Sequence, residues 1–405
     1  MNPADTAWVL ASSALVLLMT PGLAMFYGGM TRAKNVLSTM MHSFFLMGLA
    51  SLVWLFWGYS LAFGPDAFGG LIGNLDYFAL KGVTGDVKPD TTIPHTTFMI
   101  FQCMFAIITP ALISGAFAER MKFSAFVIFM LIWLTVVYCP VAHWVWGPGG
   151  FMAGWGALDF AGGTVVHINS GVAALACAIV IGKRKGYGTT PMPPNNLTLT
   201  LLGAGLLWFG WFGFNAGSAL AANAGASNAF VVTHMATASA AVSWVCAEWI
   251  IRGKPTSLGV ASGAVAGLVA ITPACGYVGP VSSVIIGGVA GVVCYLAVLA
   301  KGSLGYDDAL DVVGIHGVGG TWGAIATGLF ACATVPGNKV NGLFFGNASQ
   351  LWIQIGAVLG TIIYSFVVSL IILYVVKAIV GLRVTEEQEV VGVDTSEHGE
   401  AAYNI

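Results

Sequence analysis

The segment Gly162-Gly-Thr-Val-Val-His167-Ile-Asn-Ser-Gly171 holds one histidine inside an apolar, glycine-rich stretch. Val312-Val-Gly-Ile-His316-Gly-Val-Gly-Gly320 does the same in the second half of the chain. A titratable group is costly inside a bilayer, so it is rare there and usually lines a pathway. Histidine is the side chain whose unperturbed pKa lies closest to neutral pH. The pair therefore predicts conduction of a species that can gain or lose a proton.

The composition around these segments is that of a membrane protein. The chain is 57% hydrophobic and only 8% charged, whereas soluble domains have about 25% charged residues. Apolar runs of about 20 residues are typical of membrane-spanning helices, and they predict an all-α membrane protein with eleven transmembrane helices. The expected spans are 6–29, 39–63, 95–118, 123–142, 160–182, 195–218, 225–251, 256–275, 280–299, 312–333 and 349–377.

The basic residues predict the orientation of these spans. With the N-terminus outside, twelve Lys and Arg residues fall in inner loops: Arg32, Lys34, Arg120, Lys122, Lys183, Arg184, Lys185, Arg252, Lys254, Lys301, Lys377 and Arg383. Only Lys81, Lys88 and Lys339 fall outside. This positive-inside bias predicts a multi-pass protein of the cell (inner) membrane with a cytoplasmic C-terminus. No basic region precedes the first span, so we expect no signal peptide.

The two histidine segments also indicate a faint internal repeat. A glycine follows each histidine by four residues, at Gly171 and Gly320. Five spans end with the helix of His167 and the next five end with that of His316, so the halves would have opposite topology, an arrangement known from many transporters. We expect two inverted five-helix repeats plus one extra helix. The glycines beside each imidazole predict a narrow cleft rather than a packed face.

Spacing along the chain does not by itself bring the histidines together. At 1.5 Å per residue, His167 lies about 12 Å from the outer end of its expected helix, and His316 about 6–8 Å from the inner end of its own. The seven cysteines mostly fall inside spans and lack metal-ligand spacing, which favours small core residues over disulfides. We expect a membrane domain at 1–380 and a tail at 381–405, whose stretch 385–405 has six acids and no Lys or Arg.

Four motifs make the chain resemble the ammonium transporters of the Amt/Mep/Rh superfamily, on the bacterial Amt branch. They are Asp159-Phe-Ala-Gly-Gly-Thr-Val-Val-His167-Ile-Asn169, Trp211-Phe-Gly-Phe214-Asn-Ala-Gly-Ser218, Gly314-Ile-His316-Gly-Val318 and Gly381-Leu-Arg-Val-Thr-Glu-Glu-Gln388. The resemblance implies a homotrimeric ammonium channel of nitrogen metabolism, with one pore per subunit between the two halves. It implies a transporter rather than an enzyme, with no cofactor, no metal and no nucleic-acid partner.

The resemblance also assigns roles to particular residues. Phe105, Trp146 and Ser218 match the family's outer site for NH₄⁺ recruitment, where aromatic faces attract a cation and an oxygen accepts a hydrogen bond. Phe105 and Phe214 match a gate below that site. His167 and His316 match twin pore histidines that share a hydrogen bond. The implied mechanism is deprotonation of NH₄⁺ and passage of NH₃, with or without separate proton transfer.

Other polar residues have simpler interpretations. Asp159 begins the His167 helix, where it could cap the first N–H groups and also stabilise a nearby cation. Glu119 and Arg120 close the third span and are expected to form a structural pair. Four further histidines are expected to be structural: His42, His95, His143 and His234.

The tail motif implies a partner, and two other functions stay open. The stretches from Gly381 to Glu389 and from Ser396 to Tyr403 resemble a family tail that packs on the cytoplasmic face, touches the neighbouring subunit and helps a trimeric PII-type signal protein plug the pores. A solvated acidic tail is the alternative. The chain could also be an ammonium sensor that binds ligand without much flux. A further alternative is a membrane-bound enzyme or electron-transfer subunit whose histidines ligate haem.

Overall fold

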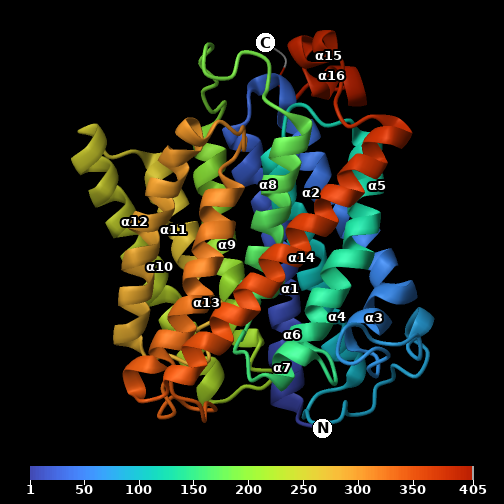
Figure 1. Cartoon of the computed structure of the whole chain (residues 1–405), viewed down its shortest axis with the longest axis vertical. Coiled ribbons are helices and arrows are strands. Elements are labelled where there is room, and N and C mark those ends of the chain that lie inside the picture. The colour runs from blue at the N-terminus through green and yellow to red at the C-terminus, as the bar shows by residue number, and fades with distance from the viewer. Residues whose placement is uncertain (404–405) are drawn as a thin grey trace.

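The computed structural model describes residues 1–403, which form one helical bundle (Figure 1). Within these residues the backbone forms helices, loops and three isolated β-bridges, with no strand. The long segments are α1 (Pro3–Met30), α2 (Val36–Val53) continued by η2 (Trp54–Gly58) and α3 (Tyr59–Phe63), α4 (His95–Phe117), α5 (Phe123–Trp133) continued by η4 (Leu134–Tyr138) and α6 (Cys139–Trp146), η5 (Gly163–Ile168) continued by α8 (Asn169–Ile181), α9 (Leu197–Gly217), α10 (Ala224–Arg252), α11 (Ser257–Ile271), α12 (Pro280–Leu304), η6 (Val313–Val318) continued by α13 (Gly319–Phe330), and α14 (Ala348–Val380). The short segments are η1 (Ala33–Asn35), η3 (Phe78–Leu80), α7 (Phe151–Gly154), η7 (Leu343–Phe345), α15 (Glu386–Val391) and α16 (Val393–His398).

The predicted all-helical class agrees with the structure, whereas the number of spans is only partly matched. In the described part of the chain, nine helical segments are long and apolar enough to cross a membrane. The expected spans 256–275 and 312–333 correspond to shorter helices, α11 and the segment Val313–Phe330. Eleven spans therefore remain a prediction.

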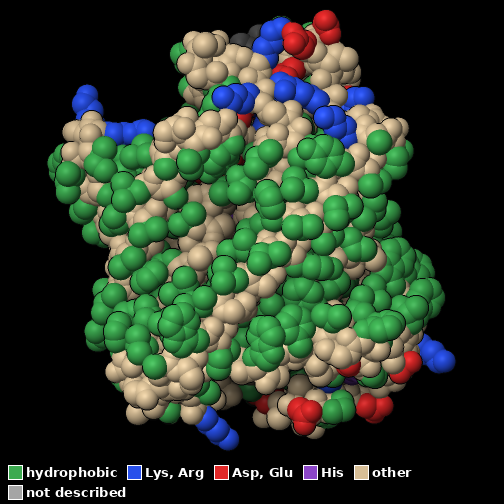
Figure 2. All heavy atoms as spheres, in the orientation of Figure 1, with side chains coloured by type: hydrophobic (Ala, Val, Ile, Leu, Met, Phe, Trp, Pro, Cys, Tyr) green, Lys and Arg blue, Asp and Glu red, His purple; other side chains and the backbone are tan. Residues whose placement is uncertain are grey.

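The surface has the distribution that a bilayer requires. Figure 2 shows hydrophobic side chains over the middle of the visible face and charged side chains gathered at the two ends. The N-terminus lies at one end of the bundle, and α15 and α16, the last helices of the described chain, lie at the other (Figure 1). We call these the N-terminal end and the tail end.

The two histidine helices pack against each other in antiparallel fashion. A Cβ atom on Gly171 would lie 2.1 Å from the backbone nitrogen of Gly317, and one on Gly320 would lie 2.9 Å from the Cβ of His167. The later residue of the first helix, Gly171, thus meets the earlier residue of the second, Gly317, and the earlier residue His167 meets the later residue Gly320, so the two helices run in opposite directions. The glycines do not form the cleft that was expected there, because the other histidine helix occupies the space beside them. They let the backbones approach closely, as small residues do between membrane helices.

Each of these helices opens with a π-helical turn that contains its histidine, η5 for His167 and η6 for His316. Single π-helical turns are rare and often occur at functional sites. Both turns begin among buried residues, including Ala161 and Val312. The histidines thus lie near the starts of two helices that begin inside the protein. This places them at the same depth, which the spacing along the chain did not predict.

We predict that the N-terminal end faces outward. Arg32 follows α1 and Lys81 follows α3, so one membrane crossing separates them. Reporter fusions after Arg32 and after Lys81 should report opposite sides of the membrane, with the Arg32 fusion in the cytoplasm. Both fusions on the same side would contradict the topology, and fusion after Lys377 serves as the cytoplasmic reference.

Candidate functional site

Two buried histidines lie in direct contact at the centre of the bundle. The Nδ1 atoms of His167 and His316 are 3.2 Å apart, and their rings lie 5.3 Å apart at 28°. One Nδ1–H must therefore donate to the other, unprotonated Nδ1. The Nε2 atom of His167 is buried and has no protein partner among the described residues. In this arrangement the two Nδ1 atoms face each other and leave no room for a metal ion between them.

A small apolar cavity surrounds the histidine pair, and we call it the histidine cavity. Its volume is about 10 Å³, and its walls include both histidines, Trp211, Phe214 and aliphatic side chains from α1, α4, α9 and α11. This is about the space that one water molecule needs. Trp211 stacks on His167 at 5.4 Å, and its Nε1–H donates to Thr272 Oγ1 at 2.9 Å. The indole is therefore held in place and presents its face to the cavity.

A pair of phenylalanines adjoins the histidine cavity on the side of the N-terminal end. The rings of Phe105 and Phe214 are 4.4 Å apart at 38°. Phe214 also stacks on His167 at 6.0 Å, and Trp146 meets Phe105 edge-on at 5.8 Å. Both phenylalanines are almost fully buried. The predicted gate residues, Phe105 and Phe214, therefore lie between Trp146 and the two histidines.

Beyond the phenylalanines lies a second, wider pocket, the aromatic pocket. Its volume is about 180 Å³, and it is lined by Phe63, Phe98, Gln102, Phe105, Trp146, Phe160, Ser218 and Leu220. The structure thus brings together all three residues of the predicted recruitment site. Ser218 donates its hydroxyl hydrogen to Phe214 O at 2.8 Å, so its oxygen lone pairs remain available. Trp146 Nε1–H donates to Asp159 O at 2.9 Å, which fixes the indole ring.

Asp159 caps the His167 helix. Its carboxylate accepts from the backbone N–H groups of Gly162, Gly163 and Thr164 at 2.6–2.8 Å, and also from the Thr164 hydroxyl. These bonds satisfy N–H groups that a helix start leaves without partners. Asp159 is buried, so these bonds and the helix dipole are what stabilise its position.

Asp308 caps the His316 helix as Asp159 caps the His167 helix, and the sequence analysis did not predict this role. Its Oδ2 accepts from Val313 N at 2.7 Å, at the start of the His316 helix. Its Oδ1 is buried without a protein partner in the described chain. Asp159 precedes His167 by eight residues, and Asp308 precedes His316 by eight as well. That shared spacing, together with the glycine four residues after each histidine, was the available signal for a repeated capping unit.

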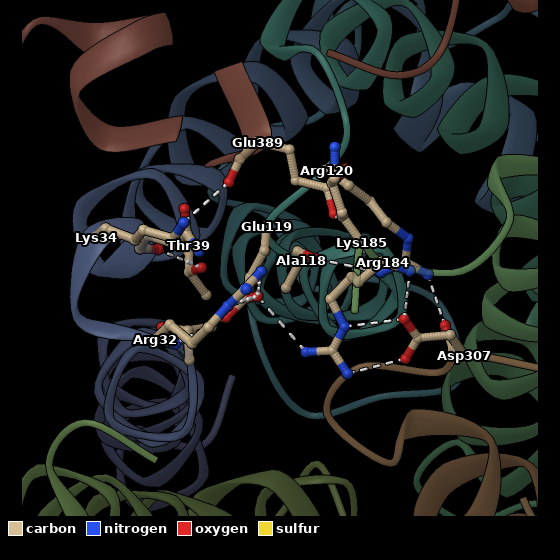
Figure 3. A network of polar contacts seen from close by, with 12 residues as sticks. Arg32, Lys34, Thr39, Ala118, Glu119, Arg120, Arg184, Lys185, Asp307 and Glu389 are labelled. Carbon is tan, nitrogen blue, oxygen red and sulfur yellow. Dashed lines mark hydrogen bonds and ion pairs between the residues drawn. The ribbon is translucent and has the colours of Figure 1, made fainter. Parts of the chain in front are cut away.

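At the tail end, charged groups from distant loops form a buried network (Figure 3). Arg184 binds Asp307 through two hydrogen bonds of 2.8–2.9 Å. Glu119 pairs with Arg32 at 2.5 Å and lies 3.6 Å from Arg184. The expected pair of Glu119 with Arg120 is wrong, because Arg120 instead donates to backbone carbonyls, including Gly182 O and Ala116 O, each at 3.0 Å.

The tail is docked onto this network. The Glu389 carboxylate accepts from Lys185 N and from Arg383 at 2.6 Å. Asp394 accepts from the backbone N–H groups of Leu37 and Ser38 at 3.0 and 2.7 Å, and so caps the start of α2. Glu389 and Asp394 are both buried. Glu389 and Asp394 therefore anchor the tail on the bundle, while other acidic residues of the tail, such as Glu386, stay exposed.

The four histidines expected to be structural do not line the histidine cavity. His95 hydrogen bonds Tyr59 at 2.5 Å, and His143 hydrogen bonds Ala62 O at 3.0 Å. His234 packs against Trp208, and His42 is buried among phenylalanine rings. These contacts lie within the packed bundle, and a structural role for the four histidines stays a prediction.

The helical membrane bundle and its narrow, histidine-lined cavity define the chain as a multi-pass membrane protein of the transporter class. Residues 7–403 match the model of the Ammonium Transporter Family. The chain belongs to this family, as its motifs suggested.

Relatives from bacteria and archaea match along the full length. The ammonium transporter of Bacillus subtilis strain 168 is 54% identical, covering 100% of this chain and 99% of its own. Amt1 of Archaeoglobus fulgidus is 50% identical and covers 100% of both. Among solved structures, Mep2 of Candida albicans has a TM-score of 0.90 and 38% identity, covering 96% of this chain and 88% of its own. A protein described as a sensor Amt protein has a TM-score of 0.90 and 30% identity, covering 98% of both chains.

We predict that Asp308 makes stability depend on pH. Burial raises the pKa of Asp308 to about 6. Because the folded protein then holds this proton more tightly than the unfolded chain, the cost of ionising Asp308 is absent at low pH and grows as the pH rises toward 6. Asp308→Asn keeps a capping oxygen without a charge, so it should gain stability relative to the native protein between about pH 4 and 6.

Thermal unfolding in detergent at several pH values would measure this effect. Asp308→Ala is the matched comparison, since it also loses the cap and should be destabilised by about 0.5–2 kcal/mol relative to Asp308→Asn. A constant stability difference between the native protein and Asp308→Asn from pH 4 to pH 7 would contradict the prediction.

Proposed function

We propose that this chain transports ammonium by recruiting NH₄⁺ in the aromatic pocket, removing a proton at the phenylalanine gate and conducting NH₃ past His167 and His316. The observation that carries the proposal is the histidine cavity. It is apolar, it has room for one small molecule, and its polar contribution comes from imidazoles. The Nε2 of His167 is buried and has no protein partner in the described chain, and we propose that it bonds a molecule that enters the cavity.

Recruitment rests on the chemistry of the aromatic pocket. NH₄⁺ is a cation with four N–H donors. The faces of Trp146 and Phe105 attract a cation, and each such contact contributes about 0.5–2 kcal/mol. The free lone pairs of Ser218 accept one N–H. The backbone carbonyl of Asp159 accepts a hydrogen bond from Trp146 Nε1–H. We propose that the buried negative charge of the Asp159 carboxylate also favours the cation.

Selectivity would follow from the narrow apolar passage. Moving an ion from water into a low-dielectric site is expensive, and a group that can lose its proton becomes neutral instead. NH₄⁺ can do so, giving NH₃ and a proton, whereas K⁺ and Na⁺ cannot. Potassium selectivity would require rings of carbonyl or carboxylate oxygens, and none line the histidine cavity in the described chain.

We also propose the family architecture for this chain. The antiparallel histidine helices, each capped by an aspartate eight residues before its histidine, support two inverted five-helix repeats. In this scheme α11 and Val313–Phe330 are the eighth and tenth of eleven spans, α14 is the extra helix, and the pore lies between the halves. Exposed apolar side chains on α10, α12 and α14 would contact lipid or neighbouring subunits of a homotrimer in the inner membrane.

The docked tail supports a regulatory role. Its acidic residues contact the loop after α1 and the loop after α8, on the same face as the charged network. A hydrogen bond and the charge of Glu386 raise the pKa of Lys185, which holds an exposed tail contact ionised. We propose that a three-fold PII-type protein binds this face, because a trimeric target repeats each contact identically.

A sensor is the second candidate function, because the chain is as similar in fold to a sensor Amt protein as to Mep2. A sensor would bind ammonium in the aromatic pocket with little flux.

Uptake assays combined with current recording in proteoliposomes test the proposed function. Ammonium should be taken up by the proteoliposomes, and potassium should not. Current that accompanies uptake would show that the proton follows by its own route, whereas uptake without current would show conduction of NH₃ alone. Binding of ammonium without any uptake would contradict transport and favour the sensor.

We predict that the histidines control selectivity. His167→Ala and His316→Ala should each lower ammonium flux at least tenfold or admit potassium, because NH₃ or water then meets a cavity of different size and polarity. Flux of ammonium and potassium through folded protein measures this. Trp208→Leu, outside the cavity, is the control. A double histidine variant with native flux and native potassium exclusion would leave the histidines as packing residues.

We predict that the tail is regulatory and not needed for insertion. Truncation after Leu382 should leave the protein inserted but lower its flux or remove its inhibition by PII. Asp394→Ala should give a weaker form of the same effect, because it removes the cap on α2. Asp394→Asn, which can still accept one hydrogen bond, is the matched control.

Pull-down with the organism's own PII protein, with and without ATP and 2-oxoglutarate, would accompany the flux measurement. Equal PII binding and normal regulated flux in the truncated protein would show that the docked tail is only structural.

A further inference from the structure

His42 is a buried histidine to which neither the motifs nor the proposed pathway assigns a role. It lies on α2, near the end of this helix that Asp394 of the tail caps, and it is only 2% exposed. Neither Nδ1 nor Nε2 has a hydrogen-bond partner within the described chain. A buried charge without a partner costs far more than a buried neutral polar group, so this site holds the imidazole in its neutral form.

Three phenylalanines surround the His42 ring, and we call them the phenylalanine cage. The ring centroids of Phe126, Phe117 and Phe123 lie 4.3, 5.7 and 6.4 Å from that of His42. Phe117 and Phe126 are fully buried, whereas Phe123 is partly exposed. Phe123 is therefore the wall of the cage that reaches the surface of the bundle.

The tail holds this wall in place. Glu397 accepts a hydrogen bond from Phe123 N at 2.9 Å and so caps the start of α5, to which the N-cap residue Lys122 makes no side-chain bond. The His398 ring meets the Phe123 ring edge-on at 5.2 Å. The Nε2 of His398 is also buried without a partner in the described residues. Phe123 thus contacts one imidazole from α2 and one from the tail.

The groups around the cage give a proton on His42 no counter-charge. His398 of the tail is the titratable group that faces it, and a charged His398 would repel a second positive charge. Lys122, at the start of α5, is a further cation of this region. The acids of α16, Asp394 and Glu397, are engaged with backbone N–H groups at the starts of α2 and α5. From α4 and α5, phenylalanine rings face the imidazole.

We propose that His42 makes the docking of the tail sensitive to acid: a proton on His42 opens the phenylalanine cage at Phe123 and releases Glu397 and α16. A charged imidazole needs water or an acceptor, and the cage admits water only when its outer wall moves. Because that wall carries the tail contacts, its movement detaches the tail. The inference rests on the proposed regulatory role of the tail for its effect on transport, whereas docking itself is measured separately.

Opening of the cage should become easier as the pH falls. The docked state holds a neutral imidazole, and the open state takes up a proton with the ordinary imidazole pKa of about 6.5. The equilibrium constant for opening should therefore rise about tenfold from pH 7.5 to pH 5.5. Asp394 acts in the opposite direction, because burial raises the pKa of its carboxyl group and acid then favours its docked form. Asp394→Asn removes this opposing contribution.

Hydrogen–deuterium exchange at the backbone amides of α15 and α16, corrected for the intrinsic pH dependence of exchange, measures the opening in detergent. In the Asp394→Asn background the opening constant should rise about tenfold from pH 7.5 to pH 5.5. Adding His42→Phe, which fills the cage without a titratable group, should reduce the rise to less than twofold. His42→Leu is the second variant should His42→Phe insert poorly.

His234→Phe in the same background is the matched control, because His234 is exposed on α10 and packs against Trp208. It should keep the tenfold rise. A rise of less than twofold with His42 present, or a tenfold rise in an inserted His42 variant, would overturn the proposal.

Flux measured at two internal pH values separates this proposal from the regulatory role of the tail. If acid opens the tail while flux and its inhibition by PII stay unchanged, the His42 proposal stands and the regulatory role falls. If exchange at α15 and α16 does not respond to pH while truncation after Leu382 alters regulated flux, the regulatory role stands and the His42 proposal falls.

Discussion

The close antiparallel packing of the two histidine helices is the constraint on which the site depends. Any side chain larger than hydrogen at Gly171 would meet the backbone of Gly317, and Gly320 meets His167 in the same way. Only with these glycines can the helices approach until the imidazoles share a hydrogen bond. The cavity around them is small because the backbones that frame it are in contact, and a small cavity excludes a hydrated ion.

Helix starts inside a membrane bundle need their own partners, and two aspartates supply them. A helix that begins beneath the surface leaves N–H groups away from water, which is costly in a bilayer. Asp159 and Asp308 accept from these groups. Their negative charges also lie at the positive ends of the helix dipoles. The caps thus allow both histidines to lie at the centre of the bundle.

The tail end of the bundle is held by charges that come from separate loops. Removing one member of a buried ion pair leaves the other unpaired, so such networks hold loops in one arrangement. Asp307, which binds Arg184, is followed directly by Asp308, the cap of the His316 helix. Glu389 of the tail binds the neighbouring Lys185. The tail is therefore connected to the His316 helix through contiguous contacts within one chain.

The sequence by itself determined the membrane class, most helix positions and the family, because apolar runs of bilayer length and long motifs are local properties. It also singled out His167 and His316, since a titratable residue in such a run is conspicuous. Only the tertiary structure decided that the histidines touch and that the space beside Gly171 and Gly320 is occupied by the other histidine helix. It also decided that Glu119 pairs with Arg32 rather than Arg120. These facts depend on π-helical turns, buried helix starts and loop contacts between residues far apart in the chain, which leave no periodic signal in the sequence.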